Sequence, residues 1–174
     1  LDAFQTIPEV FNLADKYQLP AIILSDLLIS DETSTVDPEL LDMQPVIDRG
    51  ELITEVGDEA GDYERYKFTD SGISPRAIPG IPGYEHVVST DEHMPDGVLI
   101  SDEFTHPHKR RAMLEKRQRK MDGLLADLPP PAIVGAADAE VTLVGWGSTA
   151  GVIQEAIGQL AQAGVSVNHL HFKW

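Results

Sequence analysis

The sequence contains no cysteine among its 174 residues. This absence excludes disulfide bonds, a thiolate nucleophile, cysteine-ligated zinc and a cysteine-held iron–sulfur cluster on the chain itself. Apolar runs are short, and none approaches the roughly 18 residues that a membrane-spanning helix needs. A basic stretch followed by an apolar one, as in a secretory signal, is also missing from the first residues. These features predict a cytoplasmic protein.

Positive charge is scarce. Thirteen lysine and arginine residues face 29 aspartate and glutamate residues, so the formal net charge is −16. Such a charge repels nucleic acid and anionic membranes, and we expect neither as a partner. Aspartate outnumbers glutamate and lysine is rare. This composition fits a salt-adapted proteome, and an acidic solubilising surface explains it equally well.

The first 30 residues predict a helix followed by a strand. Four apolar residues have the spacing of one helix face: Ile7, Val10, Phe11 and Ala14. They predict a core-facing helix over residues 7–17, which Pro20 ends. Residues 21–24 are all apolar, which predicts a short strand buried on both faces, as in a parallel sheet. One helix and one strand form a unit of an α/β fold and not a whole domain.

Residues 31–105 have little periodicity and are rich in aspartate, glutamate, proline and glycine. Weak strand patterns occur at 51–56 and 65–68. A structureless segment of this length is uncommon inside a compact domain. It is therefore either a disordered linker or an ordered arm whose partners lie elsewhere. Proline and glycine at turn positions favour the ordered arm, because they lower the entropy cost of ordering it.

Residues 106–128 predict a second long helix, ended by the prolines at 129–131. One stripe is apolar: Met113, Leu114, Met121, Leu124, Leu125 and Leu128. The other face holds seven of the 13 positive charges: Lys109, Arg110, Arg111, Lys116, Arg117, Arg119 and Lys120. We expect the apolar stripe to face the core, and the basic face to be solvated or to dock on an acidic partner surface.

The last part predicts a parallel βαβ unit, with strands at 140–144 and 165–172 around a helix at 148–160. The turn Gly145–Gly151 has the spacing GxGxxxG, one residue longer than the dinucleotide fingerprint, and no acidic residue follows the second strand. A tight turn with Ser148 or Thr149 capping the helix is therefore favoured over a phosphate cradle in a nucleotide-binding module.

Two pairs of histidines are spaced as His-x-His, at 106 and 108 and at 169 and 171. On a strand this spacing puts both rings on one face, as in a metal site. No third ligand is placed by the sequence, so we predict no metal site.

Arginine 76 lies in the most constrained stretch of the chain, residues 69–80. Gly72 permits a turn, while Pro75 holds Ser74 extended and presents Arg76 rigidly. A rigid guanidinium suits bidentate binding of a carboxylate or phosphate. An ion pair with a protein carboxylate is an equal or better explanation.

Blocks along the whole chain resemble the alpha subunit of the 2-oxoacid:ferredoxin oxidoreductases, most nearly the 2-oxoglutarate type. The blocks stand in the family's order and are Phe11–Tyr17 with Pro20 and Leu24–Asp26; Tyr66 with Thr69; Gly72–Arg76 with Pro79–Gly80; Glu92–His93 with Gly97; Lys116–Arg117 with Lys120; and Val144–Thr149 with Gly151, Glu155–Ala156, Leu160 and Gly164.

The resemblance implies an α/β fragment in three parts. Residues 1–30 would end a thiamin-diphosphate-binding (pyrimidine) domain, residues 31–131 would form a long irregular connecting arm with the basic helix, and residues 132–174 would begin a transketolase-C-terminal-like domain with the parallel βαβ unit. The family's Tyr-Pro-Ile-Thr-Pro and Gly-Pro-Ser-Thr segments have no match, so no catalytic residue is carried over. Weak candidates for substrate or interface contacts are Ser74, Arg76 and His93.

The implied activity is oxidative decarboxylation of a 2-oxoacid, 2-oxoglutarate first, to an acyl-CoA with ferredoxin as electron acceptor. The implied cofactors are thiamin diphosphate with Mg²⁺ and a [4Fe–4S] cluster, held mainly by a beta subunit, with coenzyme A as co-substrate. The implied partners are that beta subunit and ferredoxin. The 174-residue chain alone is expected to bind none of these cofactors and to be inactive. A non-catalytic interaction or scaffold fragment is the alternative.

Overall fold

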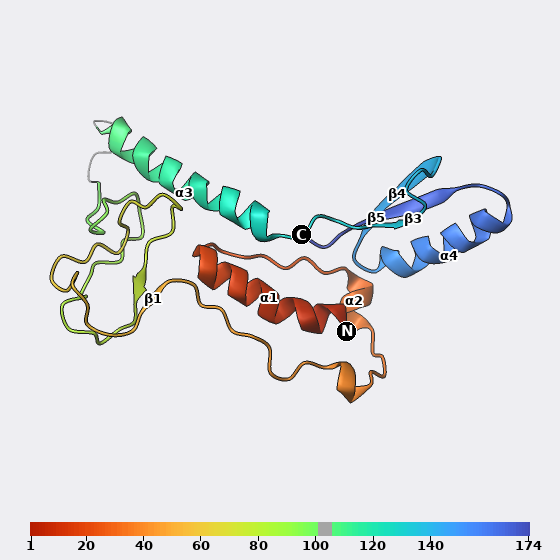
Figure 1. Cartoon of the computed structure of the whole chain (residues 1–174), viewed down its shortest axis with the longest axis horizontal. Helices are drawn as coiled ribbons and strands as arrows, with labels where there is room; N and C mark the ends of the chain where they lie inside the picture. Colours follow the sequence, from red (N-terminus) through yellow and green to blue (C-terminus); the bar gives the residue numbers. More distant parts are fainter. Residues whose placement is uncertain (101–105) are drawn as a thin grey trace. The chain divides into compact units, whose positions relative to one another are not determined.

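Residues 1–100 and 106–174 are described by a computed structural model with an α/β fold (Figure 1). Contacts divide the chain into two units, the first made of residues 1–3, 22–41 and 128–174, the second of residues 4–21 and 42–127. The expected three-part domain boundaries stay a prediction. Within the described residues, no helix is both long and apolar enough to span a membrane.

The first unit contains a three-stranded sheet with strand order β3–β5–β4 (Figure 1). Its strands are β3 (Ile133–Gly135), β4 (Val141–Trp146) and β5 (Val167–Phe172). β4 and β5 are parallel and joined by α4 (Thr149–Gln162), which confirms the predicted βαβ unit. β3 pairs antiparallel with β5 and was not predicted. Three residues are too few to show a strand period.

The predicted strand at residues 21–24 is wrong. The run is irregular, and Ile22 and Leu24 are 85% and 77% exposed. It leads into a short helix, α2 (Leu27–Asp31), and a 3₁₀ turn at Pro38–Leu40. A run that is apolar at every position becomes a buried strand only between neighbouring strands. Among the described residues, no strand pairs with residues 21–24.

Two long helices belong mainly to the second unit, α1 (Asp2–Tyr17) and α3 (Pro107–Asp127). Both predicted helices are present, α1 with a start five residues earlier than expected. The predicted core-facing stripe of α1 is wrong, because Ile7 and Phe11 are 44% and 70% exposed. They meet at Tyr17, which is 4% exposed and donates a 2.9 Å hydrogen bond to the carbonyl of Gly123. A Cβ at Gly123 would lie 3.2 Å from the Tyr17 ring. The small residue therefore lets the ring lie close against α3.

Within the described residues, the long arm is irregular and ordered, as favoured from its sequence. Among the described residues, β1 (Leu52–Ile53) pairs with β2 (Arg76–Ala77) in parallel, and His93 and Leu99 form an isolated antiparallel bridge. The weak strand pattern at 65–68 was wrong, because these residues form turns. Tyr63 fastens the arm: its hydroxyl donates to the Pro75 carbonyl at 2.9 Å and accepts from the Ala77 amide at 3.1 Å. A small core gathers here: Ala77, Ile81 and Tyr84, with Ile53 and Tyr63 packed against it.

Helix α3 buries a different face from the one predicted. Met113 is 2% exposed, as expected, but Lys116 and Lys120 are only 4% and 8% exposed. The apolar residues Leu114 and Leu125 are 42% and 66% exposed. The arm packs on the side that carries Met113 and the two lysines. Lysine can be buried on this face because its long aliphatic stem packs against a neighbouring segment as an apolar side chain does.

Residues 69–76, called the strap below, lie directly against α3 at Gly72. A Cβ on Gly72 would be 2.2 Å from the carbonyl oxygen of Lys116, and its φ is +78°. Both the contact and the backbone conformation require glycine. The strap turn is closed by Thr69, whose hydroxyl donates to the Ile73 carbonyl at 2.7 Å.

The first prediction tests this contact. Gly72→Ala should lower the free energy of unfolding by more than about 2 kcal/mol, because left-handed strain of about 1–2 kcal/mol adds to a backbone clash. Gly80→Ala is the matched control, since its φ is +96° and nothing lies within 4 Å of the added Cβ. Urea unfolding measures both variants. Equal losses in the two would show that the strap does not depend on close approach to α3.

Candidate functional site

Serine 74 is sealed inside the strap. It is 1% exposed, and its hydroxyl donates to the Lys67 carbonyl at 2.8 Å. Its own carbonyl accepts a 2.6 Å hydrogen bond from the side-chain amide of Gln18, just beyond α1. These bonds give Ser74 a structural place within the unit. Its predicted part in substrate or interface contacts stays a prediction.

Arginine 76 binds a carboxylate of the same chain. Its guanidinium lies 3.2 Å from Asp15 on α1, and Arg49 contacts the other carboxylate oxygen of Asp15 at 2.8 Å. Hydrogen bonds from Arg49 and Arg76 lower the pKa of Asp15 against the opposing effect of burial. The anion expected near Arg76 is thus supplied by α1 in this structure. A contact between Arg76 and substrate stays a prediction.

Histidine 93 is buried between the arm and α3. Its ring lies over Tyr66, with centroids 3.8 Å apart, and Nδ1 lies 3.0 Å from the Met94 carbonyl oxygen. That bond makes Nδ1 the protonated nitrogen of the neutral ring and leaves Nε2 as an acceptor. The ring borders a largely apolar hollow of about 270 Å³, lined by Phe68, His93, Met94, Pro95, Ile100, His108, Lys109, Ala112 and Met113.

Next to His93, Glu92 and Arg117 form a bidentate ion pair with distances of 2.7 and 3.0 Å. Both residues lie in blocks that carry the family resemblance. The pair joins the arm to α3 and neutralises one of the helix's cations. It therefore fixes this part of the arm by charge as well as by packing.

The two buried lysines of α3 are the feature that sequence analysis missed. Lys120 donates to the carbonyl of Gln18 at 3.2 Å, at the end of α1. Burial lowers the pKa of Lys116 to about 8, helped by the positive charges of Lys120, Arg65 and other cations. A signal was present in the sequence, since Met113, Lys116 and Lys120 have the spacing i, i+3, i+7 of a single helix face.

The N-terminus of α4 is occupied by Asp26 rather than capped by its own side chains. One Asp26 oxygen accepts from the Ser148 amide at 2.7 Å and the other from the Ile29 amide at 3.0 Å. The Ser148 side chain makes no capping bond, and the Thr149 hydroxyl donates to the Trp146 carbonyl at 2.6 Å. The predicted cap by Ser148 or Thr149 was therefore wrong.

The position of Asp26 also argues against a phosphate-binding turn at Gly145–Gly151. A Cβ on Gly147 would lie 2.4 Å from an Asp26 oxygen, so the glycine turn makes room for this carboxylate. Hydrogen bonds from the Ile29 and Ser148 amides lower the pKa of Asp26. A carboxylate of the chain thus holds the place at the helix end where a phosphate would bind.

Only one histidine pair lies on a strand, as the spacing argument assumed: His169 and His171 on β5, whose rings are 5.2 Å apart. His106 lies directly before α3 and His108 in its first turn, with rings 5.9 Å apart. His169 is 1% exposed, its Nε2 has no partner, and burial together with the charge of His171 lowers its pKa. Among the described residues, no group of three or more histidine, cysteine or acidic side chains is placed to hold a metal ion.

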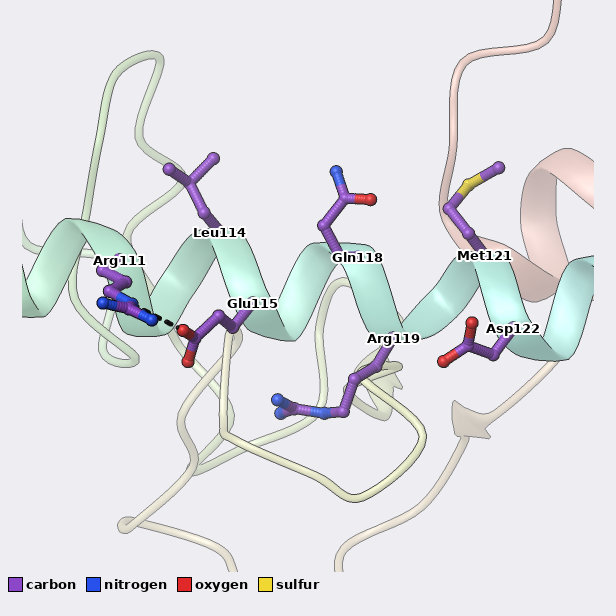
Figure 2. A pocket seen from close by; sticks show the side chains of 7 residues that line it. All are labelled: Arg111, Leu114, Glu115, Gln118, Arg119, Met121 and Asp122. Atoms are coloured by element: carbon purple, nitrogen blue, oxygen red, sulfur yellow. Dashed lines mark hydrogen bonds and ion pairs between the residues drawn. The ribbon is translucent and has the colours of Figure 1, made fainter.

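A second hollow of about 570 Å³ runs along the exposed face of α3 (Figure 2). Every residue lining it belongs to that helix: Arg111, Leu114, Glu115, Gln118, Arg119, Met121 and Asp122. Figure 2 shows Leu114, Gln118 and Met121 pointing to one side of the helix. The Arg111–Glu115 ion pair, 2.7 Å long, is highly exposed. Because all the lining side chains lie on one solvent-exposed helix, they do not converge on a common point where a substrate could react.

Comparisons with known proteins find relatives that are similar in sequence along nearly the whole chain. It is 32% identical over 162 residues to the 2-oxoacid:ferredoxin oxidoreductase 1 alpha subunit of Sulfurisphaera tokodaii, covering 90% of this chain and 24% of that protein. It is 32% identical over 175 residues to the 2-oxoglutarate oxidoreductase subunit KorA of Mycobacterium tuberculosis, covering 99% of this chain and 25% of that one. The chain is homologous to a segment of 2-oxoacid:ferredoxin oxidoreductase alpha subunits. No model of a protein family matches it.

A solved structure shows the same fold. The 2-oxoglutarate:ferredoxin oxidoreductase of Magnetococcus marinus, with 2-oxoglutarate, coenzyme A and succinyl-CoA bound, matches with a TM-score of 0.73 and 32% identity. The match covers 93% of this chain and 27% of that chain. The chain thus spans about a quarter of the length of the oxidoreductase relatives it matches. The suspected resemblance and the α/β fold class are confirmed.

The second prediction concerns Asp26. Asp26→Asn should lower the melting temperature at pH 7, because the carboxylate that accepts from two helix N-termini is lost. The folded pKa is lowered, so this stabilisation is present above the unfolded value of about 3.9 and disappears as the pH falls through the folded value. The difference between wild type and variant should therefore close below about pH 4. Asp138→Asn, an exposed aspartate of the same unit, should change little; an equal effect of both would contradict the capping role.

The third prediction concerns the Arg76–Asp15 ion pair. A double-mutant cycle with Arg76→Met and Asp15→Asn should give a coupling energy of about 0.5–1 kcal/mol in urea unfolding, since both side chains remain partly exposed. The exposed pair Arg111–Glu115 is the matched control and should give less. A coupling energy of zero for Arg76 and Asp15 would leave the arginine free to bind another anion.

Proposed function

We propose that the chain is part of the alpha subunit of an enzyme that oxidatively decarboxylates a 2-oxoacid. The proposed substrate is 2-oxoglutarate, the product is the acyl-CoA, and the electrons pass to ferredoxin. The observation that carries this proposal is the continuous similarity over 90–99% of the chain to subunits named for this reaction. The match to a solved enzyme with 2-oxoglutarate and coenzyme A bound supports the substrate.

The proposed cofactors do not fit the residues described here. The chain has no cysteine for an iron–sulfur cluster. The described residues also contain no acidic or histidine cluster placed for the Mg²⁺ of thiamin diphosphate. We therefore assign these cofactors to other parts of the enzyme, mainly a beta subunit, and derive no catalytic step from this chain. Thiamin diphosphate would supply the electron sink for loss of CO₂.

Exposed apolar side chains support a place within a larger protein. Phe11 on α1 is 70% exposed, and Leu24 and Leu27 are 77% and 76% exposed. Apolar surface of this extent is typical of segments that pack against further protein. In the proposed enzyme, these exposed apolar side chains would pack against neighbouring protein rather than take part in the reaction.

The fourth prediction tests the function directly. The full-length subunit, purified with the chains that associate with it, should reduce ferredoxin or methyl viologen only when a 2-oxoacid and coenzyme A are both present. 2-Oxoglutarate should give a higher kcat/KM than pyruvate. The isolated 174-residue chain should show no activity. A complete complex that reduces neither acceptor with any 2-oxoacid would favour the scaffold alternative.

A further inference from the structure

Helix α3 turns two positive charges inward. Lys116 and Lys120 are 4% and 8% exposed, on the face that also buries Met113. Removing an ammonium group from water is costly unless an acidic group or several hydrogen-bond acceptors replace the lost water. Each buried lysine therefore needs a partner.

Lys120 has such a partner within the chain. Its ammonium lies 3.2 Å from the carbonyl oxygen of Gln18, directly after the last residue of α1. The C-terminal end of a helix carries partial negative charge, so this contact is favourable. For Lys116, no acceptor is found among the described residues. Lys116 thus lacks a hydrogen-bond partner in this part of the chain, although its Nζ is not among the polar atoms that are fully shielded from solvent.

The charged groups that lower the pKa of Lys116 are all positive: Lys120, Arg65, Arg119 and Arg117. Arg117 is already neutralised by Glu92. The pKa of Lys116 stays near 8, so the group is still mostly protonated at neutral pH. Among the described residues, four cations therefore act on Lys116, and one of them, Arg117, is paired with Glu92.

Arg119 adds a second unsatisfied donor. Its Nη2 donates to the Thr69 carbonyl in the strap at 3.1 Å, while its buried Nε has no acceptor. The Cβ of Arg119 and the Lys116 carbonyl both border Gly72, where the strap touches α3. Arg65 is held nearby through a 2.9 Å bond to the Gln18 side chain, which binds the strap in turn.

We propose that Lys116, Lys120 and the arginines around them form a binding site for one oxyanion group, a carboxylate or a phosphate. The proposed site is argued from these residues alone and does not depend on the proposed reaction. An oxyanion would accept charge-assisted hydrogen bonds from Lys116 and Arg119 and would offset the excess positive charge. The oxyanion comes either from a small molecule in solution or from an acidic side chain of an associated subunit.

The first arm of the experiment titrates inorganic phosphate, and separately glutarate, into the complete purified protein by calorimetry. For a small-molecule oxyanion we expect saturable binding that weakens with added NaCl, and at least tenfold weaker binding in Lys116→Met. Lys116→Gln, which also removes the charge, should lose as much and guards against a folding defect specific to methionine. Lys109→Met, another lysine of α3, should bind like wild type.

The second arm measures association of the subunits by analytical ultracentrifugation. For a carboxylate from an associated subunit we expect no phosphate or glutarate binding, and at least a tenfold higher dissociation constant in Lys116→Met but not in Lys109→Met. Folded Lys116→Met and Lys116→Gln proteins with unchanged anion binding and unchanged association would overturn the proposal. Equal effects of the Lys109 and Lys116 variants would overturn it as well, because general charge would then explain them.

Discussion

The close approach of the strap to α3 at Gly72 is the contact on which the second unit depends. With a hydrogen atom in place of a side chain, the strap backbone reaches the carbonyl of Lys116, where a Cβ would lie only 2.2 Å away. This approach puts Ser74 within reach of Gln18 and holds Arg76 beside Asp15. It also covers Lys116 and so creates the buried positive charge of α3. One glycine therefore determines both the packing and the electrostatics of this region.

The two units use charge at helix ends in complementary ways. In the first unit, the Asp26 carboxylate accepts from amides at the starts of α2 and α4. In the second, the Lys120 ammonium donates to a carbonyl at the end of α1. Each charge has the sign that the helix dipole favours. The Asp26–Ser148 and Lys120–Gln18 contacts join residues 122 and 102 positions apart in the sequence, so charged side chains stabilise long-range contacts in this chain.

Several acidic groups of the described residues are engaged in ion pairs and helix caps, as Asp15, Asp26 and Glu92 show. Burial and the charge of His171 lower the pKa of His169, whose Nε2 has no hydrogen-bond partner.

Local sequence patterns were enough to predict two long helices, the parallel βαβ unit and an irregular, ordered arm. Periodicity and turn residues act over a few positions, and these elements depend on little else. Tertiary structure decided which faces were buried, because Lys116 on α3 is covered only once the strap arrives. It also decided the α4 cap, since Asp26 lies 122 residues from Ser148 and no local pattern links them. The run at 21–24 shows the same limit: its apolar pattern was clear, but a strand forms only where a neighbouring backbone accepts its hydrogen bonds.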